Sequence, residues 1–167
     1  MTWFKEANNK DINYKIKKIL KTHPFTMHLL EYYNIPIEDI DNNLTIKIVD
    51  LDGKFAEGNG KKIYLDKKLF KGDFFKDNFH FVIHEFFHWI KRRYESRFYF
   101  NDSEEIQSFV LAIAWELING KKEEYIFKTI YPIVKNHFEN MNEADRVFVN
   151  MYQNALKMQS IYNGRIE

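Results

Sequence analysis

The sequence contains no cysteine, and only three prolines and six glycines in 167 residues. Without cysteine, disulfides and thiolate metal sites are excluded, so any bound metal must be held by His, Asp or Glu. No segment approaches the ~18 consecutive apolar residues of a membrane span. The first residues, MTWFKEANNKDINYK, also lack the apolar stretch of a secretory signal. We therefore expect a cytoplasmic protein with no membrane partner.

The charge is nearly balanced, with 25 Lys and Arg against 24 Asp and Glu, which gives a formal net charge of +1. Proteins dedicated to nucleic acids gain affinity from many phosphate contacts and are usually strongly basic. Three short basic clusters occur, at 15–18, 61–68 and 91–93, and we interpret them as solvated faces. The composition therefore argues against a nucleic-acid partner.

The order of patterns predicts an α+β fold that is mainly helical. Helical spacing of Ile and Leu indicates a first helix over 12–22, capped by Asp11, and a second over about 25–33. Alternation at 44–50 and 61–66 predicts two strands, with turns at 51–55 and 57–60. We expect these strands to form a small antiparallel sheet beside the following helix.

The remainder of the chain is predicted to be helical. The expected helices run from a cap at Asp73 or Asp77 to about Tyr94, and over 104–118, 121–138 and 142–160. Asn119-Gly120 is a helix stop, and Pro132 should kink or split the helix that contains it. The length favours a single domain over 1–167, with a core at about 10–118 and C-terminal helices at about 121–160.

The stretch FHFVIHEFFHWIKRR, residues 79–93, carries the most chemical information. On a helix, His84 and His88 lie one above the other, and two imidazoles so placed can bind one Zn²⁺ at ~2.0–2.1 Å. Glu85 lies about 100° around the axis, where it can reach a metal-bound water as a general base. The alternative is an aromatic core helix with two hydrogen-bonded histidines and Glu85 on the surface.

A catalytic zinc site usually needs a third protein ligand. The helix predicted at 104–118 offers Glu104, Glu105 and Glu116. Glu105 shares its face with small or apolar residues and is preferred, whereas we expect Glu104 to face solvent and keep Glu116 as the next candidate. Acidic residues are also favoured in a first helical turn by the helix dipole, which explains Glu104 and Glu105 without a metal. His137 is interpreted as structural.

Two segments, FVIHEFFHW (81–89) and SEEIQSFVLA (103–112), together resemble the gluzincin class of metallopeptidases. More narrowly, they resemble the ImmA/IrrE family of small intracellular metallopeptidases, which pairs an HExxH helix with a helix of the form ExQAxxFA. Here Glu105 stands at the family's ligand position, Gln107 and Ala112 match, and Ser108 replaces the usual alanine. The resemblance covers about residues 10–118. The metallopeptidase-like domain of ArdC antirestriction proteins is a second choice.

The resemblance implies an intracellular zinc-dependent endopeptidase that cleaves a specific protein, such as a transcriptional repressor. Zn²⁺ would be held by His84, His88 and Glu105, with Glu85 as the catalytic base. Phe86-Phe87 replaces a pair that is usually small or aliphatic, and the family's Leu-Met-Pro ending is absent. The alternative function is therefore a metal-binding, non-proteolytic interaction protein of the phage or mobile-element (antirestriction) type.

Two further elements of a peptidase site stay open at the level of sequence. An extended substrate could add to an open edge of the strand at 61–66. A donor that stabilises the oxyanion must also lie near the metal, and the candidates are Tyr94, Arg97, Tyr99, His137 and Tyr152.

Overall fold

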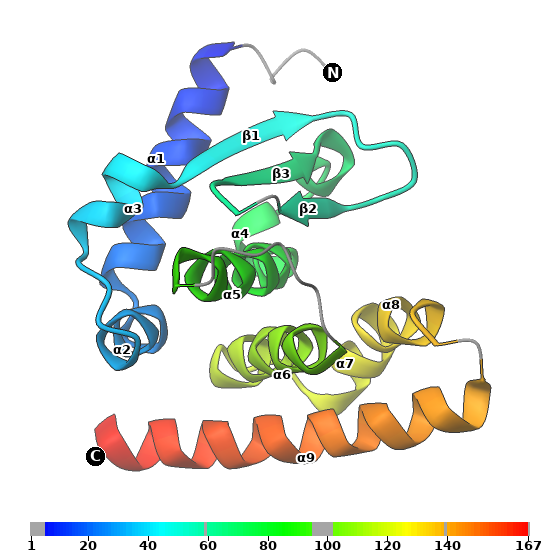
Figure 1. The fold of residues 1–167 in the computed structure, drawn as a ribbon. Coiled ribbons are helices and arrows are strands. Elements are labelled where there is room, and N and C mark those ends of the chain that lie inside the picture. Colours follow the sequence, from blue (N-terminus) through cyan, green and yellow to red (C-terminus); the bar gives the residue numbers. More distant parts are fainter. Residues whose placement is uncertain (1–5, 59, 95–101, 139, 167) are drawn as a thin grey trace. The chain divides into compact units, whose positions relative to one another are not determined.

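The computed structural model describes residues 6–58, 60–94, 102–138 and 140–166. The chain divides into two compact units, Met1–Phe98 and Tyr99–Glu167, which are taken in turn (Figure 1). Over these described ranges, no helix has both the length and the apolar character needed to cross a membrane. The expectation of a single domain stays a prediction.

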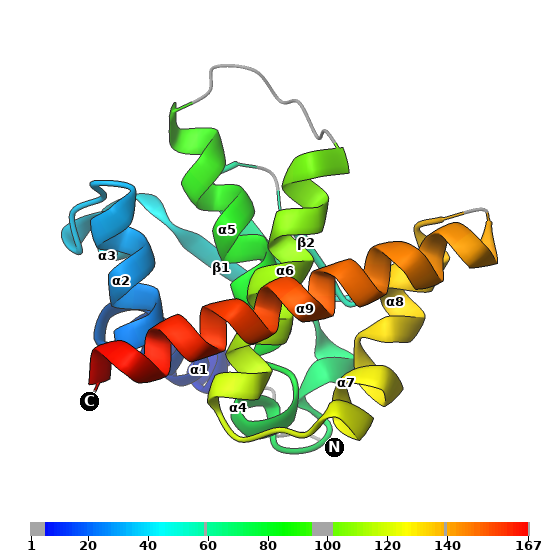
Figure 2. The same cartoon turned by 90° about the horizontal axis from the view of Figure 1, so that it is seen from below.

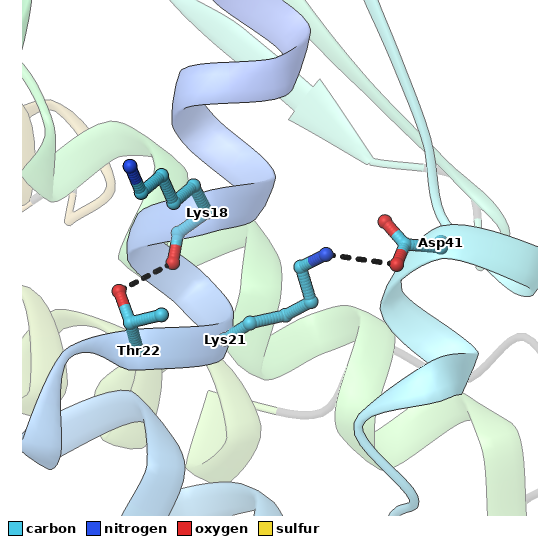
Figure 3. A network of polar contacts seen from close by, with 4 residues as sticks. All are labelled: Lys18, Lys21, Thr22 and Asp41. Atoms are coloured by element: carbon cyan, nitrogen blue, oxygen red, sulfur yellow. Dashed lines mark hydrogen bonds and ion pairs between the residues drawn. The ribbon is translucent and has the colours of Figure 1, made fainter.

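The first unit opens with three helices, α1 (Glu6–Thr22), α2 (Pro24–Tyr32) and α3 (Glu38–Asn43). α1 begins before the predicted cap, so Asp11 lies inside the helix. The second helix is confirmed: its N-cap, His23, accepts a hydrogen bond from the Phe25 N–H at 3.2 Å. An ion pair of 2.8 Å between Lys21 and Asp41 joins α1 to α3 (Figure 3), and being exposed it contributes little.

A three-stranded sheet follows, made of β1 (Thr45–Val49), β2 (Ala56–Gly58) and β3 (Lys62–Asp66) in the order β1-β3-β2. β1 pairs with β3 in parallel and β2 pairs with β3 antiparallel, so the sheet is mixed and not antiparallel throughout. The cause is β2, which occupies part of an expected turn and takes one side of β3. β3 is therefore central, and the open edge predicted for 61–66 is wrong.

The segment after the sheet also differs from its prediction. A 3₁₀ helix, η1 (Lys67–Phe70), leads to a short helix α4 (Phe74–Asp77), and only then to α5 (His80–Tyr94). Asp73 caps α4 by accepting the Lys76 N–H at 3.2 Å. The single expected helix is split because Asn78 leaves helical geometry and donates from Nδ2 to the Leu69 carbonyl at 2.8 Å.

The second unit contains α6 (Asp102–Ile118), α7 (Glu123–Thr129), α8 (Tyr131–Asn136) and α9 (Met141–Ile166). α6 ends where predicted: Gly120 has φ +91°, and the Lys121 N–H donates to the Glu116 carbonyl at 2.9 Å, as in a Schellman motif. The split near Pro132 is also confirmed. α9 packs along α6 (Figure 2). The mainly helical α+β class is thus confirmed.

Candidate metal centre

α5 lies against β2 and β3 of the first unit and is apolar on most of its surface. The fully buried side chains of this region include Phe79, Val82, Ile83, Phe86 and Ile90. Three neighbouring polar residues share the helix with them: His88 is 1% exposed, Glu85 is 8% exposed, and His84 is half-buried. A helix that is apolar on most sides packs in the interior. The apolar residues of α5 therefore bury the three polar residues along with the helix.

His84 and His88 lie one turn apart, as the spacing predicts. Their ring centroids are 5.0 Å apart with an interplanar angle of 67°, and each ring offers a nitrogen within 4.8 Å of one on the other. Two nitrogens that each lie ~2.0–2.1 Å from one zinc ion must be within about 4.2 Å of each other. A small side-chain rotation therefore suffices for both rings to bind one ion.

The carboxylate of Glu85 lies against the backbone of β2. A Cβ atom built on Gly58 would stand 2.6 Å from Oε2 of Glu85 and 3.7 Å from its carboxyl carbon. The predicted alternative, a core helix with Glu85 on the surface, is therefore wrong in this respect. Taking a carboxylate out of water is costly, so a buried Glu85 is a feature that a packing role for α5 alone does not explain.

The acidic candidates for a third ligand all belong to α6 of the second unit. Glu105 is half-buried, Glu104 is 6% exposed and Glu116 is 1% exposed. The prediction that Glu104 faces solvent is wrong, because α6 is buried on nearly every side and leaves no face for it. Glu116 lies eleven residues after Glu105, about 16 Å along the helix axis. Glu105 and Glu116 are therefore too far apart to serve the same ligand position.

His137 lies next to Glu105 within the second unit. Its Nε2 is 3.8 Å from Oε1 of Glu105, and its Nδ1 is 3.0 Å from the Ile133 carbonyl. Its ring also packs edge-to-face on Phe109, with centroids 5.3 Å apart. If Nδ1 donates to that carbonyl, Nε2 carries a hydrogen toward Glu105 only in the protonated ring. His137 thus lies beside Glu105 and packs on Phe109, and its structural role stays a prediction.

Only some of the candidates for oxyanion stabilisation belong to the described residues. Arg97 and Tyr99 lie outside the described residues, as does the side chain of Tyr94. Tyr152 lies near Phe127, with ring centroids 6.4 Å apart. Burial, followed by the charges of Glu123 and Glu124, raises the pKa of Tyr152. An unshifted tyrosine is already neutral near pH 7, so this shift gives Tyr152 no advantage as an oxyanion donor.

Two residues near the site did not emerge from the sequence patterns. Gly58 was assigned to a turn, yet a glycine inside a strand often marks a place where another group approaches the backbone, and that signal would have found it. His80 is 3% exposed, lies one turn before His84, and has its ring 4.4 Å from that of Phe81. Histidines at 80, 84 and 88 thus form a row along α5.

Comparison with known proteins identifies no relative. No family model matches the chain, and no curated protein or solved structure matches it significantly. The resemblance to the ImmA/IrrE family therefore depends on the two helical segments quoted above, and membership of that family stays a prediction.

Proposed function

We propose that this protein is an intracellular zinc-dependent endopeptidase, in which Glu85 is the general base. The proposal rests on three residues of α5, His84, Glu85 and His88. Two histidines one turn apart offer ring nitrogens within 4.8 Å of each other, and the glutamate between them is buried at 8% exposure against a strand. Core packing accounts for buried histidines, whereas a buried carboxylate beside them is expected of a base that acts on a metal-bound water.

Zinc fits the donor atoms that the chain offers. His84 and His88 contribute imidazole nitrogens and Glu105 a carboxylate oxygen, a set that is usual for catalytic zinc. With no cysteine in the chain, softer thiolate sites are excluded. Among the acidic candidates we choose Glu105 because it stands at the ligand position of the resembling family and is half-buried, so its carboxylate is accessible to a ligand.

Each residue has a defined task in the proposed reaction. A zinc ion held by the three ligands would polarise the scissile carbonyl and acidify a water molecule. Glu85 accepts the proton of that water and returns it to the leaving amine. Since β2 is one of the two edge strands of the sheet and its Gly58 lies against Glu85, an extended peptide added along β2 would pass close to this base. β2 replaces the strand at 61–66 in this role.

A specific cytoplasmic protein, such as a transcriptional repressor, follows from the resemblance to the ImmA/IrrE family. The bulky Phe86 and Phe87 are both buried, at 0% and 2% exposure. Their side chains therefore fill the interior and do not stand on the surface of α5.

The proposal is tested by metal analysis and proteolysis on the same set of proteins. Purified wild type should bind about one zinc per chain. His84→Ala and Glu105→Ala should lose it, whereas the exposed control His28→Ala should keep it. Glu85→Gln should retain zinc and lose cleavage, and the exposed Glu31→Gln should behave as wild type. Cleavage by Glu85→Gln at the wild-type rate would refute the proposed peptidase function. Zinc binding by a wild-type protein that cleaves no peptide would favour the non-proteolytic alternative.

A further inference from the structure

Gly58 is a glycine that the backbone does not require. Among the glycines of the described chain, Gly53, Gly60 and Gly120 have positive φ values, and Gly58 does not. Any L residue could therefore adopt its conformation. What distinguishes Gly58 is the space beside it, because a Cβ would stand 2.6 Å from Oε2 of Glu85 and 3.8 Å from the Lys62 carbonyl. Two carbon or oxygen atoms in ordinary contact keep about 3.5 Å apart.

We propose that Gly58 is a positioning residue: the missing side chain leaves the space in which the Glu85 carboxylate is held against β2. This inference rests on the proposed function, since it concerns the placement of its general base. The carboxylate end of Glu85 occupies the position that any other residue at 58 would take. β2 thereby forms a wall against which the Glu85 carboxylate lies.

An added methyl group should move the carboxylate rather than the strand. Gly58 faces Ile63 in the antiparallel ladder between β2 and β3, so moving the strand would break backbone hydrogen bonds. Glu85 touches Gly58 only with the end of a flexible side chain, which can rotate at small cost. His84 lies about 100° and His88 about 60° around the helix from Glu85, on either side of it, so the proposed metal ligands should stay in place.

The experiment compares Gly58→Ala with Gly72→Ala. Gly72 is a matched control because it also lacks a positive φ and a Cβ there would meet nothing within 4 Å. Crystal structures of the metal-free proteins should show the Glu85 carboxylate displaced by about 1 Å in Gly58→Ala, the shift that restores normal contact. In Gly72→Ala it should stay where it is in wild type. Zinc content should equal that of wild type in both variants.

Activity supplies the second measurement, on any peptide of an unstructured library that wild type cleaves. In Gly58→Ala, kcat should fall about 100-fold with little change in KM, as expected for a base misplaced by about 1 Å. Gly72→Ala should match wild type. An undisplaced carboxylate, or a fall in kcat accompanied by loss of zinc, would overturn the positioning role. A displaced carboxylate in a protein whose wild type cleaves nothing would support the positioning role and refute the peptidase.

Discussion

Replacing Asp66 by alanine should show how the sheet that supports Glu85 is held. Asp66 ends β3 and is 6% exposed. Its Oδ2 accepts the Leu51 N–H at 2.7 Å, and its Oδ1 accepts the Lys68 N–H at 2.8 Å. One carboxylate thus ties the loop after β1 to the start of η1. The substitution removes both acceptors at once and leaves two backbone donors to find water.

The size of the effect follows from these two bonds. A hydrogen bond to a charged group contributes about 1.5–3 kcal/mol, and loss of a helix cap costs about 1 kcal/mol. Both bonds are only partly buried, so solvent screens part of their strength. The two contributions sum to about 2.5–4 kcal/mol, and with this screening we expect Asp66→Ala to lower the free energy of unfolding by about 2–3 kcal/mol.

The same carboxylate should make stability depend on pH. Burial acts to raise the pKa of Asp66, but the N–H donors of Lys68 and Leu51 and the charges of Lys68 and Lys71 outweigh it, so its pKa is lowered from 3.8. A group with a lowered folded pKa stabilises the protein above its unfolded pKa, and this stabilisation is lost as the pH falls through the folded pKa. As the pH falls below 3.8, the free energy of unfolding should therefore decrease less in Asp66→Ala than in wild type.

Urea denaturation followed by circular dichroism, at pH 7 and at steps down to pH 3, measures both quantities. The exposed helical residue Asp11 provides a control, and Asp11→Ala should change the free energy of unfolding by less than about 0.5 kcal/mol. A loss below about 1 kcal/mol in Asp66→Ala at pH 7 would refute the reasoning. An acid dependence identical to that of wild type would refute the assigned pKa shift.

Four other predictions concern the site and the core. Glu85→Gln should lower kcat by about 10²–10⁴-fold at unchanged zinc content, and an intact kcat measured on a cleaved peptide would contradict it. His88→Ala should abolish the rise in melting temperature that zinc causes in wild type and a chelator reverses; a rise that persists would show that His88 is not a ligand. Phe86→Ala should lower the free energy of unfolding by about 3–5 kcal/mol, since Phe86 is fully buried. A loss below about 1 kcal/mol would show that neighbouring side chains fill the cavity. Gly120→Ala should cost about 1 kcal/mol because φ is +91°, and a neutral result would mean that the helix end rearranges.

Local patterns were enough to predict most of the elements. The helical stop at Asn119-Gly120 and the split near Pro132 depend on single residues with restricted backbones, and both were confirmed. The strands at 44–50 and 61–66 showed alternation over several residues and correspond to β1 and β3. The placement of His84 one turn from His88 follows from helical geometry alone. These features share one cause, which is that each is decided within a few neighbouring residues.

Other features have no local signature. β2 is only three residues long, too short to show a period, and it exists as a strand because β3 pairs with it. The break before α5 depends on a bond from Asn78 to Leu69, nine positions earlier in the chain. Burial of Glu104 was also missed, because its position about 100° around the helix from Glu105 indicated a side that faces solvent, and only the packing of α6 buries it.

The sequence by itself determined that one helix carries His84, Glu85 and His88 in the order a zinc peptidase uses, because a residue's position around a helix depends only on its number. Tertiary structure alone decided that β2 forms one edge of the sheet and that Gly58 lies against the carboxylate of Glu85. Contact between residues 27 positions apart depends on how a strand and a helix pack, and no pattern of neighbouring residues encodes that.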